Sequence, residues 1–191
     1  MTTTSRERAK ADRRTAIVRA AAAQFARRGF SGVSLEEIGA AVGVSGPAVY
    51  RHFASKQALL GTILVETSEG LLAGGREVAA AHASAEDTLA ALIGFHLDFA
   101  LSSPDVIRVQ DRDLASLGAA DNHAVRRLQR EYVDLWVEVL ARLHAECTGD
   151  DLRVRAQACF GLLNSTPHST RTSDARARGI LTAMALAALS A

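Results

Sequence analysis

The chain has 191 residues, enough for one large domain or two small ones, and 48% of them are hydrophobic while only 5% are aromatic. Ala, Leu, Arg and Glu are abundant and Pro occurs only three times, which predicts an all-helical protein with a core of small aliphatic side chains. The polar, basic N-terminus has no signal-peptide pattern, and the longest apolar run, residues 179–191, is too short to span a bilayer. We therefore expect a soluble, cytoplasmic protein.

The net charge of +1 hides an asymmetry along the chain. Residues 1–56 carry ten Lys or Arg and four Asp or Glu, whereas the rest of the chain carries twelve and seventeen. A basic head on an acidic body suits a protein that presents one end to a polyanion such as a nucleic acid, although a solvated basic tail explains the same charges. Cys147 and Cys159 lack zinc-ligand spacing, so we expect free thiols, no metal and no cofactor.

The first elements are predicted from caps and helical spacing. Residues 1–9 are Thr-rich and polar and are expected to be disordered. Apolar residues then recur at helical intervals, which predicts a first helix over residues 11–28. Ser34 and Glu37 have the spacing of a capping box, so a short second helix should run from there to about residue 42.

A tight turn and a third helix should follow. Gly43 is expected to take the left-handed conformation that ends the second helix. Ser45 and Pro47 suit the N-cap and first turn of a third helix, which should reach residue 52 or 53. Two short helices joined in this way form a helix-turn-helix, and Gly39 supplies the small residue needed where they cross. An ordinary helical hairpin is the alternative interpretation.

Helical periodicity continues through the rest of the chain. Ser55 should cap a long fourth helix that reaches about residue 81. Later helices are expected over residues 84–101, from residue 104, and over 121–147, 150–165 and 174–189, which makes about nine helices in all. Residues 164–173 should form a loop, and the polar run 108–113 should join two helices.

The run of residues 25–60 resembles the N-terminal domain of the TetR family of regulators. Its most diagnostic part is Tyr50-Arg51-His52-Phe53, followed by Ser55-Lys56. Gly39 stands where Ala is commoner in the family, a difference that should alter packing rather than function. The resemblance implies a helix-turn-helix DNA-binding domain over residues 1–55 and a helical ligand-binding and dimerisation domain over residues 56–191.

Roles in DNA binding follow from the resemblance and from side-chain chemistry. A recognition helix meets the major groove with its N-terminal residues, while flanking side chains contact phosphates. The base-edge candidates are Ser45, Gly46, Pro47, Ala48 and Arg51, and the phosphate candidates are Ser34, Tyr50, His52 and Lys56. A packed or capping role is the alternative for His52. The basic arm over residues 6–14 should add phosphate or minor-groove contacts, unless it is merely solvated.

The C-terminal half of such a regulator holds a ligand cavity and a dimer interface of two helices from each subunit. The ligand-binding candidates are Phe95, His96, Phe99, Arg108, Arg112, Tyr132, Trp136 and Asn164. The interface candidates are Ala156, Phe160, Leu163, Ile180 and Met184. An apolar cavity with an arginine at its mouth suits a fatty acid or an acyl-CoA, whereas a core role for the aromatics and self-pairing of the polar run are the alternatives.

These patterns together predict a DNA-binding homodimer that acts as a repressor and is released from a palindromic operator by a small molecule. An activator is the alternative that the sequence leaves open. A helical enzyme and an adaptor that has lost DNA affinity are the rival classes. No Gly-rich phosphate loop, HExxH or G-x-S-x-G motif supports an enzyme.

Overall fold

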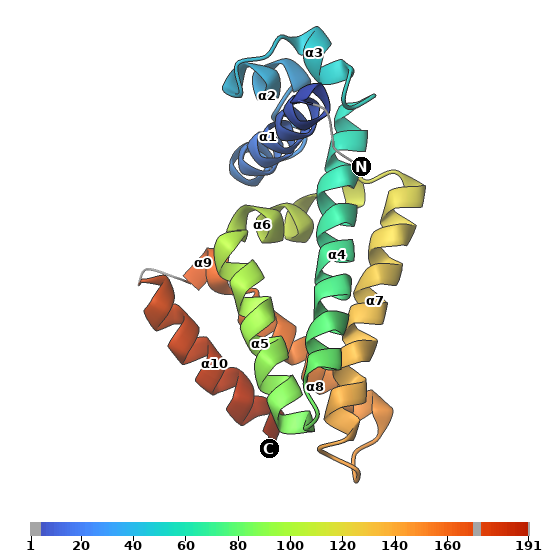
Figure 1. Ribbon diagram of the computed structural model, residues 1–191, viewed down its shortest axis with the longest axis vertical. Coiled ribbons are helices and arrows are strands. Elements are labelled where there is room, and N and C mark those ends of the chain that lie inside the picture. The colour runs from blue at the N-terminus through green and yellow to red at the C-terminus, as the bar shows by residue number, and fades with distance from the viewer. Residues whose placement is uncertain (1–4, 170–172, 191) are drawn as a thin grey trace.

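The computed structural model describes residues 5–169 and 173–190, which form helices joined by short connections (Figure 1). The elements are α1 (Ser5–Arg28), α2 (Leu35–Ala41), α3 (Gly46–Tyr50), α4 (Lys56–Ala81), α5 (Ala85–Ser102), α6 (Pro104–Asp113), η1 (Leu114–Ser116), α7 (Ala119–Ala141), α8 (Gly149–Leu163), α9 (Thr166–Ser169) and α10 (Asp174–Ser190). No strand occurs within the described ranges, which confirms the all-helical prediction.

Helix α4 links two parts of the molecule. The helices α1, α2 and α3 form a head at one end of α4, and α5, α6 and α7 pack along its remaining length, with α10 on the side of α5 away from α4 (Figure 1). The head has a core that includes Ile17, Phe25, Ile38 and Val49, and this core continues into α4 and α6. A second core lies among the helices of the body and contains Trp136. The head is therefore packed onto the body rather than tethered to it.

The local signals that the sequence carries are present in the head. Ser34 Oγ accepts a hydrogen bond from the Glu37 amide at 3.2 Å, and the Ser34 amide donates to Glu37 Oε2 at 2.8 Å. The bond from the Ser34 amide, with help from Arg28, lowers the pKa of Glu37 to about 2. Gly43 has a φ of +70° in the turn that follows α2, as predicted. A residue with a side chain would adopt this φ only under strain.

Several boundaries differ from the prediction. Helix α1 begins at Ser5, so residues 5–9 are helical rather than disordered, since Arg, Lys, Glu and Ala all favour a helix; residues 1–4 lie outside the described part. The polar run 108–113 belongs to α6 and is not a connection. Helix α7 ends at Ala141, short of residue 147, because the chain must become extended at Thr148 to form the capping box of α8. The expected loop over residues 164–173 contains the short helix α9.

Two further expectations concern chemistry rather than shape. Cys147 and Cys159 are free, and burial raises the pKa of the Cys159 thiol to about 11. Among the described residues, no single helix combines the length and apolarity that a membrane span needs; α5 together with the segment 104–116 passes that test only as a pair bent by 84°.

Candidate nucleic-acid interface and ligand cavity

The α2–α3 pair is packed unusually closely. A Cβ atom added to Gly39 would lie 2.8 Å from Val49 Cγ2 and 2.9 Å from the carbonyl oxygen of Val44. Val49 is fully buried and is the only buried residue of α3. One side of α3 therefore anchors the helix against α2, and its other sides remain open to solvent.

The open surface of α3 carries most of the predicted DNA-binding residues. Ser45, Pro47, Tyr50 and Arg51 are exposed, and Gly46, Ala48 and His52 are half-buried. Ser45 occupies the N-cap position, but its side chain makes no capping hydrogen bond. Its hydroxyl is thus free for another partner. Tyr50 is 51% exposed, an unusual state for an aromatic side chain that contributes nothing to the core.

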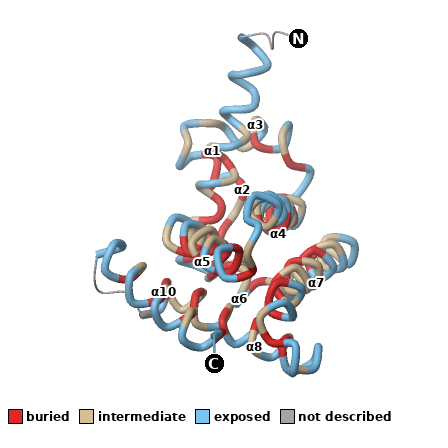
Figure 2. Tube along the Cα trace, turned by 60° about the horizontal axis from the view of Figure 1, so that its bottom comes forward, coloured by how far each residue is buried: buried red, intermediate tan, exposed pale blue. Residues whose placement is uncertain are grey.

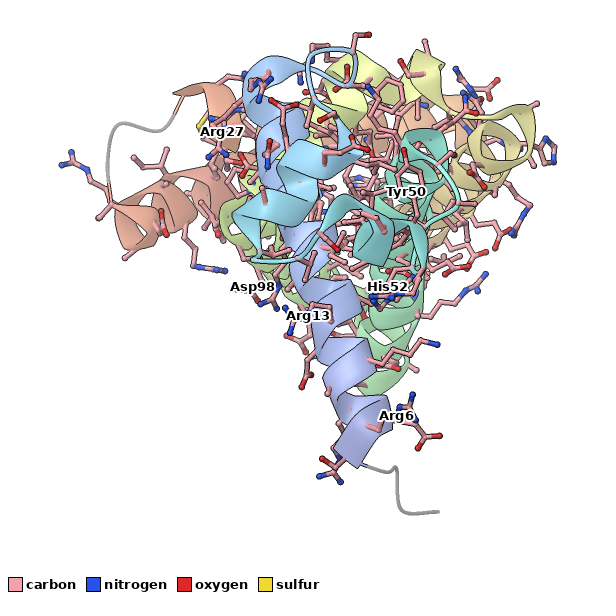
Figure 3. The ribbon with its side chains drawn as sticks, turned by 90° about the horizontal axis from the view of Figure 1, so that it is seen from above. Arg6, Arg13, Arg27, Tyr50, His52 and Asp98 are labelled. Atoms are coloured by element: carbon pink, nitrogen blue, oxygen red, sulfur yellow. The ribbon has the colours of Figure 1, made fainter. Side chains whose placement is uncertain are left out.

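Positive charge gathers beside this helix. The pKa of His52 is lowered, first by partial burial and then by the charges of Lys10, Arg51, Arg14 and Arg13. The first turns of α1 project from the head as an exposed rod (Figure 2). Seen from the head end, Arg6 lies far out on this rod, while Arg13 lies closer to the level of His52 (Figure 3). The basic arm is thus a helical extension on the same end of the molecule as α3.

The remaining two phosphate candidates also serve the fold. Ser34 Oγ accepts the Glu37 amide, but its hydroxyl proton stays available for donation. Lys56 Nζ donates to the carbonyl oxygens of Phe30 and Val33, both at 2.8 Å, and lies 4.5 Å from the centroid of the Phe30 ring. Lys56 therefore fastens the segment between α1 and α2 and keeps one N–H for a further acceptor.

A cavity of about 460 Å³ opens in the body, within the size range of small-molecule sites. Helices α4, α5, α6, α7 and α8 contribute to its wall. The lining residues are Ser68, Leu71, His96, Phe99, Ile107, Gln110, Arg126, Leu128, Gln129, Arg130, Tyr132, Val133, Arg153, Gln157, Phe160 and Asn164.

Four of the eight predicted ligand residues lie in this wall. These are His96, Phe99, Tyr132 and Asn164. Trp136 is fully buried behind the wall, with its ring centroid 4.8 Å from that of Phe160. Phe95 packs instead toward Gly74.

Neither predicted ligand arginine lines the cavity. Arg108 donates to Asp105 at 3.1 Å and to the carbonyl oxygen of Pro167 at 2.6 Å. Arg112 donates to the carbonyl oxygens of Phe25 and Ala26 at the end of α1. The cations that line the cavity are Arg126, Arg130 and Arg153. The spacing of Arg126, Gln129, Arg130 and Val133 on one face of α7 is the sequence signal that would have found the first two.

The interface candidates divide into buried and exposed residues. Ala156 and Leu163 are fully buried in the core of their own subunit, and Phe160 lines the cavity. Ile180 and Met184 on α10 are 49% and 50% exposed, and Val154 on α8, which the sequence analysis did not select, is 66% exposed.

The buried histidine of the cavity gives a testable pH dependence. Burial lowers the pKa of His96 from 6.5 to about 4. Between these pH values the imidazole of His96 is therefore protonated in the unfolded chain and neutral in the folded chain. The free energy of unfolding should therefore fall between about pH 6.5 and pH 4, by roughly 2–3 kcal/mol in total, and stay level above that range. Urea unfolding at pH 7.5, 5.5 and 4.5 measures it.

His96→Gln should flatten most of this dependence, leaving smaller contributions of the same sign from His52 and, near the acid end of the range, from Glu37. His123→Gln, at an exposed position of α7, is the matched control and should keep the wild-type slope. An unchanged slope in His96→Gln would show that His96 is not held neutral by burial.

Comparisons with known proteins agree with this architecture. Residues 17–63 match the family model of bacterial regulatory proteins, tetR family, and residues 82–168 match a tetracyclin repressor-like C-terminal domain. The chain is 28% identical over 132 residues to the HTH-type transcriptional repressor KstR2 of Rhodococcus jostii RHA1, an alignment that covers 69% of this chain and 65% of that protein. The match thus spans just under two thirds of the relative's length.

Solved structures share the fold. A TetR-family transcriptional regulator from Bordetella parapertussis superposes with a TM-score of 0.81 at 24% identity, covering 91% of this chain and 93% of the other. AibR, solved in complex with isovaleryl coenzyme A and operator DNA, superposes with a TM-score of 0.74 at 20% identity, covering 90% and 97%. The N-terminal family model matches the head that exposes α3, and the C-terminal model matches the helical body. The chain therefore belongs to the TetR family of transcriptional regulators.

Proposed function

We propose that this regulator is a homodimeric repressor that a small molecule releases from a palindromic operator. The observation that carries the proposal is the exposure of α3. This helix buries only Val49, and its other residues face solvent beside a cluster of Lys and Arg side chains. Residues 1–55 would form the DNA-binding domain and residues 56–191 the ligand-binding and dimerisation domain, acting in the cytoplasm.

Each exposed group of the head has a role in this proposal. The Ser45 hydroxyl, which makes no capping hydrogen bond, would bond to a base edge in the major groove. Pro47 would make an apolar contact there with a thymine methyl. Tyr50 and the free proton of Lys56 would hold phosphates and so fix the register. The cationic rod of α1 would extend the phosphate contacts along the duplex. Because so few groups reach base edges, we expect DNA shape to supply part of the specificity.

The second copy of the chain would pack on α8 and α10. The exposed residues of α8 include Val154, Ala158 and Gly161, which recur at helical spacing on one face. Ile180 and Met184 mark the corresponding face of α10. These faces are apolar or small, so two copies can approach closely around a two-fold axis. An interface here leaves Ala156 and Leu163 in the core of each subunit.

Two helices would carry the ligand signal to the head. Ser68 and Leu71 of α4 line the cavity, and so do Ile107 and Gln110 of α6. Arg112 lies in the last turn of α6 and donates hydrogen bonds to carbonyl oxygens in the last turn of α1. A ligand that favours one placement of α4 and α6 would change the separation of the two recognition helices, as a shift between pre-existing states.

We propose a fatty acid or an acyl-CoA as the effector. The exposed arginines at the cavity opening suit a carboxylate or phosphate, and the aromatic wall suits the apolar part. The isovaleryl coenzyme A bound by AibR supports an acyl-CoA for a related fold.

Gel-shift titration on the DNA that flanks the protein's own gene tests the proposal, with octanoate, octanoyl-CoA and free CoA as added ligands. We expect specific binding that one of the acyl compounds relieves and free CoA does not. The variant Tyr50→Phe with Arg51→Ala should lose specific binding while keeping its thermal stability, since both side chains are exposed. Lys56→Ala is unsuitable here because Lys56 holds the α1–α2 segment. Binding that survives the double variant, or DNA that no acyl compound releases, would contradict the proposal.

A further inference from the structure

The cavity wall changes in chemistry from its opening to its interior. Arg126, Arg130 and Gln157 are exposed and form the rim, whereas Ser68, His96 and Tyr132 are buried. The aliphatic and aromatic residues Leu71, Phe99, Ile107 and Phe160 complete the wall. A ligand that fills this space meets cations at one end, an apolar surface along its length, and a polar group inside.

The rim favours an anion. Its lining residues include three arginines and no carboxylate. Arg126 Nε donates to the amide oxygen of Asn122 at 2.8 Å, which leaves its charge uncompensated, and no ion pair to Arg130 occurs among the described residues. Only Arg153 has a carboxylate partner, Asp134, at 2.6 Å. Two positive charges therefore remain for a ligand.

The interior holds a chain of hydrogen bonds with a fixed direction. His96 Nε2 lies 3.0 Å from Asn164 Oδ1, and because a carbonyl oxygen only accepts, Nε2 carries the proton of the neutral ring. His96 Nδ1 is then an acceptor, and the Tyr132 hydroxyl donates to it at 3.4 Å. Because Asn164 Oδ1 faces His96 in this hydrogen-bonded series, the NH₂ group of Asn164 points away from His96.

Two donors of this interior cluster are left without acceptors in the described part of the chain. Asn164 Nδ2 makes no hydrogen bond, although the oxygen of the same amide is held by His96. The buried indole nitrogen of Trp136 also meets no acceptor in hydrogen-bonding geometry, but Trp136 lies behind the cavity wall, so a ligand would meet Asn164 and not this group. Asn164 is half-buried and lines the cavity, so a ligand that fills the cavity would displace solvent from Asn164 Nδ2. A donor that loses solvent without gaining a partner is costly, so the site favours a ligand that brings an acceptor.

We propose that the effector is an organic acid or its CoA thioester whose apolar body carries a second polar group, a carbonyl oxygen that accepts a hydrogen bond from Asn164 Nδ2 inside the cavity. Asn164 is the specificity-determining residue, and His96 and Tyr132 are positioning residues that orient its amide. This inference rests on the proposed ligand-responsive function and narrows it, because an unsubstituted fatty acid would leave Asn164 Nδ2 without an acceptor.

Matched pairs of acids test the inference, since each pair differs only in one carbonyl group. The pairs are decanoate with 9-oxodecanoate, and 4-cyclohexylbutanoate with its 4-oxocyclohexyl derivative. Trp136 is the only tryptophan of the chain and adjoins the cavity, so quenching of its fluorescence reports binding directly on the full-length protein. We expect the oxo acid of at least one pair to bind ten times or more tighter than its parent, as one added hydrogen bond allows.

Variants separate the two ends of the cavity. Asn164→Leu should remove the preference by weakening the oxo acid about tenfold while leaving the parent acid unchanged or slightly tighter. Tyr132→Phe should reduce the preference without removing it, because Asn164 keeps its bond from His96. Arg126→Gln with Arg130→Gln should weaken both acids of a pair by the same factor and preserve their ratio. Melting temperatures of all variants show whether each one is folded.

The outcomes distinguish this inference from the proposed function. Equal affinity within both pairs, a preference that survives in folded Asn164→Leu, or no binding of any of the four acids overturns the inference. Preferred binding of an oxo acid that leaves operator binding unchanged would support the inference and contradict ligand-responsive repression.

Discussion

Replacing Ile180 and Met184 together by glutamate is expected to convert the protein from a dimer to a monomer and to weaken operator binding by a factor of roughly 10²–10⁴. Both side chains are about half exposed on α10, so the change should leave the subunit folded. In a dimer, however, each added carboxylate would lie in an apolar interface near its symmetry mate, where an unpaired charge is strongly unfavourable. The loss of affinity follows because a monomer binds one half-site without the effective concentration that the second head supplies.

Sedimentation velocity and anisotropy titration of operator DNA measure the two effects on the same samples. The matched control is Ala73→Glu with Ala90→Glu, which adds the same charge at exposed positions of α4 and α5. The control should remain dimeric and should bind DNA at most a few times more weakly, from added negative charge alone. A double variant at Ile180 and Met184 that stays dimeric would place the interface elsewhere.

Gly39→Ala is expected to destabilise the head by about 1–3 kcal/mol and to weaken operator binding at least tenfold. Alanine usually stabilises a helix relative to glycine, but here the new Cβ would lie 2.8 Å from Val49 Cγ2 and 2.9 Å from the backbone oxygen of Val44. The backbone oxygen cannot rotate away, so α3 must shift relative to α2. Because α3 carries the residues that we propose to contact bases, even a small shift should change how they meet the groove.

Gly70→Ala gives the opposite result and is the matched control. Gly70 lies in the interior of α4, is exposed, and has nothing within 4 Å of an added Cβ. This substitution should stabilise the protein by up to about 1 kcal/mol and leave operator affinity unchanged. Urea unfolding and DNA titration of both variants provide the comparison. If Gly39→Ala is as stable as Gly70→Ala, the α2–α3 contact is looser than the structure indicates.

The head was predictable because its signals are local. The capping box at Ser34 and Glu37 and the turn at Gly43 are set by residues within a few positions of one another, and each was identified from sequence. The body was less predictable because its determinants are distant in sequence. Arg112 illustrates this, since its carbonyl partners on α1 lie 86 and 87 residues away and no pattern within α6 points to them.

Helix α8 shows why the exposed face that we propose for the dimer contact was only partly predicted. It is rich in apolar and small residues around most of its circumference, so periodicity does not tell which side packs on its own subunit. The predicted interface residues Ala156 and Leu163 are buried in the body, whereas Val154, which was not among the candidates, is exposed on the opposite side of the helix. On α10 the choice of Ile180 and Met184 agrees with their exposure, because the alternation there with Ala177, Leu181 and Ala185 is clear.

Hydroxyl-radical footprinting of the DNA flanking the protein's own gene tests the central claim most directly, namely that two copies of α3 enter successive major grooves. The account predicts two protected segments related by a two-fold axis, with centres one helical turn of ~34–36 Å apart or a multiple of it. It also predicts that the variant Tyr50→Phe with Arg51→Ala loses both segments together. A single unpaired protected segment, or protection that the double variant retains, would contradict it.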